Sequence, residues 1–185
     1  YVHFELGGPP FFDRWCTHRG IRAACGPAGF EAERDVLYRN DGDGEFTDVS
    51  ASTGIDNPSR YGMQVAWGDL DADGDPDAYI TNDGHANALL RNDGGNQRNW
   101  LGLRMVGTSS NRDGVGAKIE LTAAGITQTR EITNGGSFLS HGDPRAHFGL
   151  GFYAAAEQVE IRWPSGKVQR LENVAANQYL AVEEP

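Results

Sequence analysis

A six-residue pattern that occurs twice is the feature of this chain that most constrains its fold. Residues 37–42 are Leu-Tyr-Arg-Asn-Asp-Gly, and the related Leu-Leu-Arg-Asn-Asp-Gly starts 52 residues later, at 89–94. Repeats of this period are typical of β-propellers and related arrays, in which each repeat forms one blade-like unit. A closed propeller has roughly four to eight blades, whereas this chain holds about one and a half repeats. The sequence therefore predicts an incomplete, propeller-like β repeat.

Short strand-like segments and tight turns fill this repeat, which we assign to residues 36–97. Residues 63–67 and 78–81 have the apolar character of strands and flank an acidic loop. Asn-Asp-Gly occurs at 40–42, 82–84 and 92–94. These residue types tolerate positive φ, so each copy predicts a tight hairpin turn.

After about residue 98 the pattern changes to alternating apolar and polar residues, which is typical of half-buried strands. One helical turn is expected near residues 154–157. Residues 98–185 are therefore predicted to form a β-sandwich or barrel. The expected strands are 100–106, 116–122, 126–132, 159–163, 168–171 and 179–182.

Overall composition agrees with an all-β chain and excludes several classes of function. The 25 glycines and 8 prolines separate short β-branched and aromatic segments, as expected for many turns. The formal net charge of −10 argues against a binder of nucleic acid or anionic membranes, since both need clustered cations. No segment of the sequence approaches the roughly 20 apolar residues of a transmembrane helix.

The most informative segment is an acidic loop with a carboxylate at every second position. Carboxylates about 4 Å apart repel by roughly 4 kcal/mol per pair at an effective dielectric constant near 20. Such a run therefore either extends into solvent or is neutralised by a cation. The five acids are Asp69, Asp71, Asp73, Asp75 and Asp77.

This spacing fits calcium, which takes roughly 6–8 hard oxygen ligands from alternate loop positions around a glycine turn. The first three aspartates would occupy positions 1, 3 and 5, and Gly74 would form the turn. Asp75 would contribute its backbone carbonyl at position 7, and Asp77 would complete the shell at position 9. Magnesium fits less well because it retains several waters.

An EF-hand shares the opening of this loop but requires a bidentate Glu at position 12 and flanking helices. Position 12 is Ile80, inside a strand-like segment. We therefore expect a calcium loop between strands. The related segment Asn40–Glu45 lacks the alternating carboxylates, so a hairpin turn is favoured there over a second ion site.

Residues 1–35 form a separate N-terminal segment with a strand-like start, Tyr1–Leu6, and two cysteines. The separation of Cys16 and Cys25 fits a small disulfide loop in an exported protein, and two unpaired thiols are the alternative. Tetrahedral zinc is not favoured, because His18 is the only other nearby soft ligand.

Two groups of motifs resemble known families. The acidic loop and residues 37–46 resemble the FG-GAP/VCBS repeat, which forms calcium-binding propeller blades in extracellular and adhesion proteins. Segments 99–103, 111–117, 136–140, 147–151 and 159–166 resemble an ASPIC/UnbV domain. Together, and with the cysteine segment, they resemble bacterial relatives of the cartilage acidic protein family. The resemblance implies calcium ligands at Asp69, Asp71, Asp73, Asp75 and Asp77 and a secreted or cell-surface location.

Catalytic motifs are weak, and we expect a protein that is not an enzyme. Ser140, His141 and Asp143 lie too close along the chain to converge as a triad, which is defined by spatial geometry. His147 is expected to be a packed histidine. The tryptophans are expected in the core rather than on a sugar-stacking platform; they are Trp15, Trp67, Trp100 and Trp163.

Three classes of function follow. The favoured one is a secreted calcium-binding structural or adhesion protein. Its expected assembly is head-to-tail through β-strand edges into an extracellular fibre, with Tyr1–Leu6 as the donated strand. A monomer in which this strand pairs within its own chain is the alternative to that assembly. A calcium-dependent carbohydrate-binding module is the first alternative, and an exposed aromatic side chain beside the acidic loop would favour it. A secreted hydrolase is the second, and a deep pocket with a perturbed carboxyl group would favour that.

Overall fold

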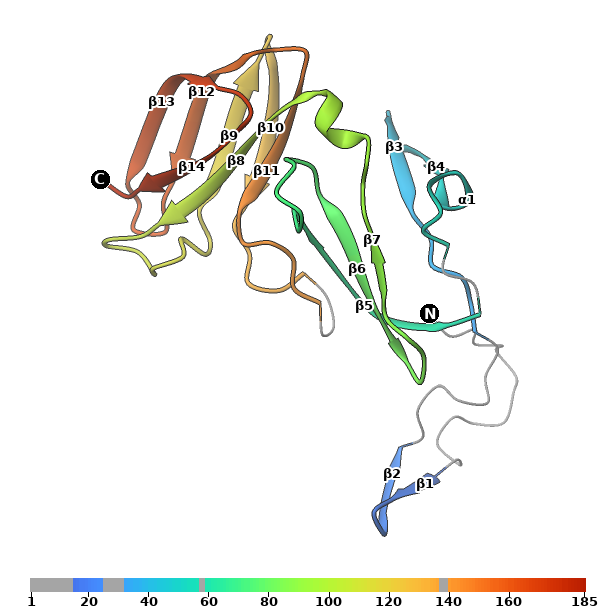
Figure 1. The fold of residues 1–185 in the computed structure, drawn as a ribbon. Coiled ribbons are helices and arrows are strands. Elements are labelled where there is room, and N and C mark those ends of the chain that lie inside the picture. Colours follow the sequence, from blue (N-terminus) through green and yellow to red (C-terminus); the bar gives the residue numbers. More distant parts are fainter. Residues whose placement is uncertain (1–14, 25–31, 57–58, 137–139) are drawn as a thin grey trace. The chain divides into compact units, whose positions relative to one another are not determined.

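The computed structural model describes residues 15–24, 32–56, 59–136 and 140–185, and these residues are nearly all in strands, turns and loops (Figure 1). The chain divides into two compact units. One comprises Tyr1–Val65 and Tyr79–Leu90, and the other comprises Ala66–Ala78 and Arg91–Pro185. The acidic loop thus belongs to the same unit as the C-terminal β domain.

Before β5, the described residues of the first unit form two β-hairpins and one helical turn. Strands β1 (Trp15–His18) and β2 (Ile21–Ala24) form one hairpin, and β3 (Tyr38–Gly42) and β4 (Glu45–Asp48) form the other. The second hairpin confirms the hairpin turn favoured for Asn40–Glu45, but the turn itself lies at Asp43 and Gly44, and the first Asn-Asp-Gly belongs to the end of β3. Helix α1 (Ser50–Thr53) follows; a segment this short gave no periodic signal in the sequence.

The repeat continues in a three-stranded sheet with the order β5-β6-β7. Its strands are β5 (Tyr61–Gly68), β6 (Asp77–Asp83) and β7 (Ala88–Leu90). The second Asn-Asp-Gly ends β6 and begins the connection to β7, which spans residues 84–87 and is longer than the tight turn predicted at 82–84. The third does not form a hairpin, because a 3₁₀ turn, η2 (Gly95–Gln97), follows it and leads into the next sheet.

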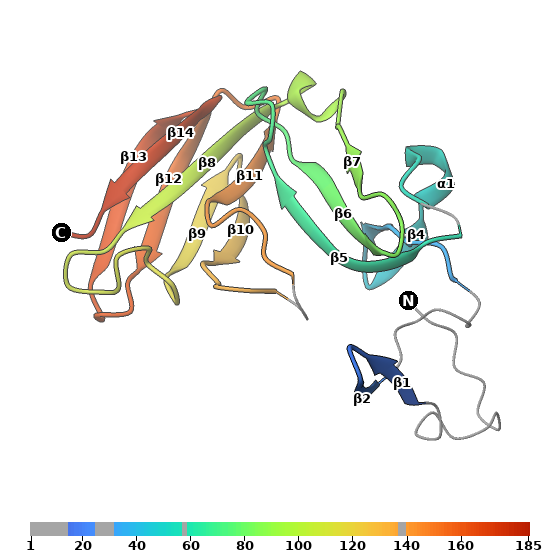
Figure 2. The ribbon, with the colours of Figure 1, turned by 60° about the horizontal axis from the view of Figure 1, so that its bottom comes forward.

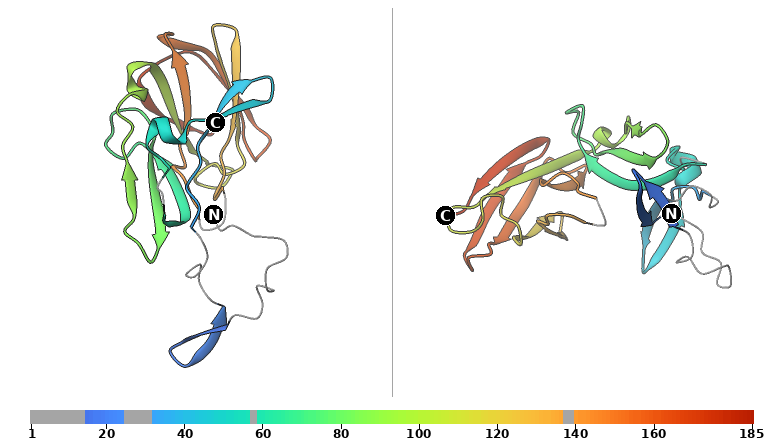
Figure 3. Two further views of the ribbon diagram at one scale, coloured as in Figure 1. Left: turned by 90° about the vertical axis from the view of Figure 1, so that its right-hand side faces the viewer. Right: turned by 90° about the horizontal axis from the view of Figure 1, so that it is seen from below.

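The C-terminal domain is a β-sandwich, as expected. One sheet has the order β10-β9-β12-β13, and the other has the order β11-β8-β14 (Figures 1 and 2). Neither sheet closes into a barrel within the described residues; the two layers can also be followed in Figure 3. The strands are β8 (Asn99–Val106), β9 (Lys118–Ala123), β10 (Ile126–Glu131), β11 (Ala146–Gly151), β12 (Ala155–Arg162), β13 (Val168–Ala175) and β14 (Gln178–Glu183).

Alternate residues of these strands fill the space between the two sheets. Leu101 and Leu103 of β8 face the same core as Phe148 of β11, and all three are completely buried. In the facing sheet, Ile119 of β9 pairs directly with Ile161 of β12, and both are also buried. Burying a side chain of this size contributes roughly 1.5–3 kcal/mol, so this core is the main source of stability for the domain.

The structure corrects the sequence interpretation of this domain in two places. The helical turn expected near residues 154–157 is absent, since β12 begins at Ala155. Strand β11 was not expected, because its alternating pattern is interrupted by Gly149 and Gly151.

Cys25 and Tyr1–Leu6 lie outside the described residues, so the disulfide and the N-terminal strand stay predictions. None of the helical turns described here has the length or apolar character needed to cross a bilayer.

A buried carboxylate near the C-terminus connects two loops of the sandwich. Glu184 is only 3% exposed and accepts hydrogen bonds from the backbone N–H groups of Thr108, Ser109 and Ser110 at 3.0, 2.8 and 2.6 Å. Its other oxygen accepts from the Ser165 hydroxyl. Burial raises the pKa of Glu184, but these hydrogen bonds outweigh burial and hold the pKa at about 2.

We expect Glu184→Gln to weaken the sandwich at neutral pH and to reduce its sensitivity to acid. Because the folded pKa is lowered, the contribution of Glu184 is complete above a pH of about 4.5 and is lost as the pH falls towards about 2. Thermal unfolding between pH 2 and pH 7 measures this. Wild type should lose stability steeply over that window, and the variant should lose less. The exposed neighbour provides the control, since Glu183→Gln should behave as wild type; equal pH slopes for all three proteins would contradict the assignment.

Candidate functional site

The acidic loop joins the end of β5 at Gly68 to the start of β6 at Asp77. Strands flank the loop on both sides, as the sequence predicted and unlike the helices of an EF-hand. Ile80, at loop position 12, lies in β6 and is 4% exposed. Ile80 is therefore one of the buried apolar side chains of this sheet.

Carboxylates of the loop hold its backbone in shape. The two oxygens of Asp69 accept hydrogen bonds from the N–H groups of Asp73 (3.1 Å) and Gly74 (3.2 Å). Asp73 in turn accepts from the N–H of Asp75 at 3.2 Å. The loop is thus wound around its own acids, which brings their negative charges close together.

Three of the five predicted ligands form a compact oxygen cluster. Asp69, Asp71 and Asp77 each offer one carboxylate oxygen, and these oxygens lie within 4.8 Å of one another. Burial and the neighbouring charge of Asp73 raise the pKa of Asp71. Asp77 is 2% exposed and is fixed by the N–H groups of Leu70 and Asn92, both at 2.9 Å. A set of hard carboxylate oxygens is the donor set that calcium prefers.

The other two predicted ligands direct their side chains to a different partner. Asn96 donates its backbone N–H to Asp75 (2.9 Å) and its side-chain amide to Asp73 (2.8 Å). Asp75 is 2% exposed, and its second oxygen, Oδ1, is buried without a hydrogen-bond partner. Burial raises the pKa of Asp75. An uncompensated buried carboxylate oxygen is costly, and a cation in the loop would offset that cost.

The second copy of the repeated hexapeptide lies beside the acidic loop. In the first copy, Arg39 pairs with Asp41 at 2.6 Å. In the second, Arg91 pairs with Asp93 at 2.6 Å and also approaches Asp71 at 4.0 Å. The two copies thus form the same local ion pair, but only the second places its arginine beside the acidic loop.

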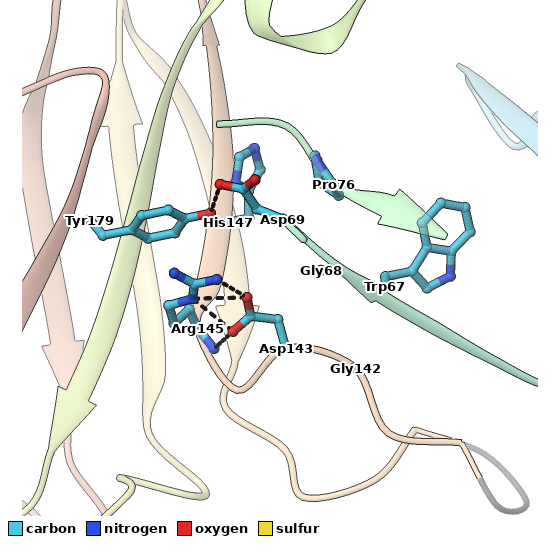
Figure 4. Close-up of a pocket in the computed structure, with 9 residues that line it drawn as sticks. All are labelled: Trp67, Gly68, Asp69, Pro76, Gly142, Asp143, Arg145, His147 and Tyr179. Atoms are coloured by element: carbon cyan, nitrogen blue, oxygen red, sulfur yellow. Dashed lines mark hydrogen bonds and ion pairs between the residues drawn. The ribbon is translucent and has the colours of Figure 1, made fainter. Parts of the chain in front are cut away.

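Tyr179 of β14 connects the loop to the sandwich. Its hydroxyl donates a 2.8 Å hydrogen bond to Asp69 Oδ2 (Figure 4). Burial, together with this bond, raises the pKa of Tyr179, so the hydroxyl keeps its proton. Its ring packs against Trp100 and lies over Gly102, where an added Cβ would approach within 2.1 Å of the ring. Gly102 therefore makes the space that Tyr179 needs.

A pocket of about 170 Å³ opens beside Asp69. Figure 4 shows Trp67 on one side of it, with Arg145 and Asp143 on the other. Arg145 forms a two-pronged ion pair with Asp143 and stacks on the Tyr179 ring at 3.8 Å. The full lining comprises Trp67, Gly68, Asp69, Pro76, Gly142, Asp143, Arg145, His147 and Tyr179.

The structure shows which of the aromatic and histidine side chains are packed and which are exposed. Trp163 is 3% exposed and His147 stacks on Trp100, as expected for packed residues. Burial lowers the pKa of His147. The expectation for Trp67 was wrong, because its side chain is 41% exposed. It lies on the solvent side of β5, whose residues alternate in exposure.

Several residues around the loop carried no signal in the sequence. Asp143 was considered with Ser140 and His141, but its carboxylate is held by Arg145. Tyr179 and Asn96 were not expected at the site. The repeated hexapeptide was the available signal for the surroundings of the loop, since its residue 92 donates its backbone N–H to Asp77.

Comparison with known proteins identifies two families in the chain. A model described as an FG-GAP-like repeat matches residues 28–80, and one described as ASPIC and UnbV matches residues 107–185. The chain is also similar to cartilage acidic protein 1. It is 30% identical to the human protein over 154 residues, which is 80% of this chain and 22% of the human protein.

Two further relatives show the same similarity. Cartilage acidic protein 1 of Xenopus tropicalis is 35% identical over 91 residues, which is 44% of this chain and 13% of the relative. The mouse protein is 30% identical over 138 residues, which is 72% of this chain and 21% of the relative. The chain thus spans about a fifth or less of the length of these curated relatives.

We expect Gly74→Ala to destabilise the second unit more than an ordinary glycine substitution does. Gly74 has φ +102°, and an added Cβ would lie 2.2 Å from the Trp100 indole nitrogen. Backbone strain and this collision together should cost about 3 kcal/mol or more in urea unfolding.

Gly125→Ala, in the same unit, is the matched control. Gly125 has φ +75° but nothing within 4 Å of the added Cβ, so backbone strain alone should cost about 1 kcal/mol. Equal losses in the two variants would show that the contact of Gly74 with Trp100 does not constrain the loop.

Proposed function

The chain belongs to the proteins that combine an FG-GAP-like repeat (residues 28–80) with an ASPIC and UnbV domain (residues 107–185), and we propose that it is an extracellular calcium-binding structural or adhesion protein. In this proposal the ion stabilises the loop and its attachment to the sandwich. A catalytic role is not part of this proposal.

The oxygen cluster of Asp69, Asp71 and Asp77 carries the proposal. Its donors are all carboxylates, two of the three side chains are partly or fully buried, and the loop supplies no cation of its own. Arg91, at 4.0 Å from Asp71, is solvent-exposed and already paired with Asp93. A surface pair of this kind contributes little, so a divalent cation is the better source of compensating charge.

The buried Asp75 oxygen supports the same conclusion independently of the cluster. Asp75 Oδ1 has no hydrogen-bond partner although the residue is 2% exposed. In water the negative charge would be solvated, whereas here it depends on nearby positive charge. When bound, calcium would supply that charge, and the loop aspartates would hold it.

Around such an ion, the residues of this chain would do the positioning. Asn92 and Asn96 fix the carboxylates of Asp77 and Asp75 through their backbone N–H groups. Tyr179 fixes Asp69 from β14. The loop therefore connects the end of the repeat with the sandwich, and a bound ion would strengthen that connection.

Calcium should raise the thermal stability of the chain, and chelation should remove that gain. Binding at 1,000 times the dissociation constant contributes about 4.1 kcal/mol. Asp71→Asn should abolish most of the calcium-dependent shift in Tm while leaving the calcium-free Tm near that of wild type, because Asp71 makes only one weak internal hydrogen bond, to Asp73 N–H at 3.3 Å.

Asp93→Asn provides a matched control, since Asp93 is an exposed acid outside the cluster. It should keep the full calcium response. Calorimetric titration with CaCl₂ and with MgCl₂ should show tighter binding of calcium. A wild-type Tm that is the same in calcium and in chelator would refute the proposal.

Self-association is a second part of the proposal. Repeats of this kind bury a continuous core only by stacking on neighbouring repeats. The first unit leaves large apolar side chains exposed, including Tyr38 (60%), Phe46 (59%) and Met63 (41%). These surfaces are suited to a second copy of the chain. The edge-strand mechanism, with Tyr1–Leu6 as the donated strand, is the form of association that we expect.

Sedimentation of the chain with calcium present tests association directly. We expect concentration-dependent assembly that deletion of residues 1–8 reduces while the shortened chain keeps its Tm. Phe46→Ser should weaken assembly as well, because it removes exposed apolar surface. A wild-type chain that stays monomeric at high concentration would contradict self-association without affecting the calcium proposal.

A further inference from the structure

The pocket beside Asp69 differs from the acidic loop in its chemistry, because it joins an exposed indole to a neutral ion pair. We infer that this pocket binds one sugar ring of a glycan, a neutral polyhydroxylated ligand. This goes beyond the proposed calcium role, which concerns the loop and its stability. Binding of a sugar in this pocket requires only that the second unit be folded.

The size of the pocket limits the ligand to something small. A volume of about 170 Å³ corresponds to roughly five or six waters at ~30 Å³ each. It lies below the roughly 300 Å³ at which pockets for drug-sized molecules begin. A single pyranose ring is of this size, whereas a nucleotide or a folded peptide segment is larger.

Trp67 supplies an apolar wall. Its side chain is 41% exposed at the edge of the pocket, and Pro76 lies on the same wall (Figure 4). A large exposed indole costs free energy in water, and covering it recovers roughly 25 cal/mol per Å². The C–H face of a pyranose is flat and weakly apolar, so it can cover the ring without bringing a charge into the pocket.

Asp143 and Arg145 supply polar groups in a fixed geometry. Asp143 accepts from Arg145 Nε at 2.9 and 2.8 Å and from the Arg145 backbone N–H at 2.8 Å. The guanidinium also lies over the Tyr179 ring, with its central carbon 3.8 Å from the ring centroid. Both side chains keep part of their surface exposed, 20% for Asp143 and 29% for Arg145. Adjacent hydroxyls, each a donor and an acceptor, match a carboxylate and a guanidinium held side by side.

The charges of the lining disfavour an anion, because the two carboxylates of Asp69 and Asp143 outnumber the one guanidinium of Arg145. A neutral ligand also avoids the repulsion that a cation would meet at Arg145. The ion pair of Asp143 and Arg145 has no net charge and is already satisfied internally. Binding of hydroxyl groups therefore needs no change in the protonation of either side chain.

Gly68 offers a way to close the pocket without touching the metal ligands. A Cβ added there would meet Asp143 Cβ at 3.6 Å, an ordinary contact, and Gly68 has no positive φ. Gly68→Ala should thus fold normally and place a methyl group in the pocket.

The test is a titration of the ¹⁵N-labelled chain with six pyranoses: glucose, galactose, mannose, fucose, xylose and N-acetylglucosamine. We expect at least one sugar to shift the Trp67 indole N–H signal with a dissociation constant in the millimolar range, equivalent to about −4 kcal/mol. Trp67→Ala and Gly68→Ala should each weaken binding at least tenfold. Phe152→Ala, which removes an 80% exposed aromatic outside the pocket, should leave it unchanged.

Running every titration in calcium and again in chelator separates this inference from the proposed function. Binding by wild type that Trp67→Ala removes while the calcium-dependent Tm shift remains would support the pocket assignment. Indole signals that do not move with any of the six sugars at about 50 mM would overturn it. Equal binding by wild type and Trp67→Ala would overturn it too, since the sugar would then lie elsewhere.

Discussion

Repulsion among five carboxylates in nine residues is the constraint on which the second unit depends. The chain reduces that repulsion by directing backbone N–H groups at the acids, from within the loop to Asp69 and from the following segment to Asp75 and Asp77. Hydrogen bonds to a carboxylate favour its charged form. They leave one buried oxygen of Asp75 without a hydrogen-bond partner among the described residues, and this supports the proposal of a bound cation.

The same constraint explains why the loop groups with the sandwich rather than with the rest of its repeat. Asp69 is held by Tyr179, and Gly74 packs on Trp100, so two residues of the β domain define the position of the loop. The sandwich can provide these contacts because its own core is complete without the loop. Leu103, Ile119 and Phe148 are fully buried between its two sheets. A stable apolar domain thus serves as the support for a highly charged segment.

Polar and aromatic side chains next to the contact between the loop and the sandwich line the adjoining pocket. Arg145 stabilises the Tyr179 ring by stacking on it and is itself neutralised by Asp143. Trp67 points to solvent because it occupies an outward position of β5. The proposed calcium site and the proposed sugar pocket could therefore share Asp69 without competing. The calcium site would use oxygens of the loop, and the sugar pocket would use Trp67 and the ion pair of Asp143 and Arg145.

The sequence by itself determined the all-β class, the place of the acidic loop between two strands and six of the sandwich strands. These features follow from local periodicity and from turn chemistry that neighbouring residues specify. Separation along the sequence concealed the other contacts of the site, since Tyr179 lies 110 residues from Asp69. Arg145 comes from the bend just before β11, and Asn96 comes from the 3₁₀ turn η2. The exposure of Trp67 could not be predicted either. Alternation along a strand shows which residues share a face of the sheet, but it does not show which of the two faces is buried. Only the packing of the two sheets, set by burial of their common core, decided which side chains meet at the loop.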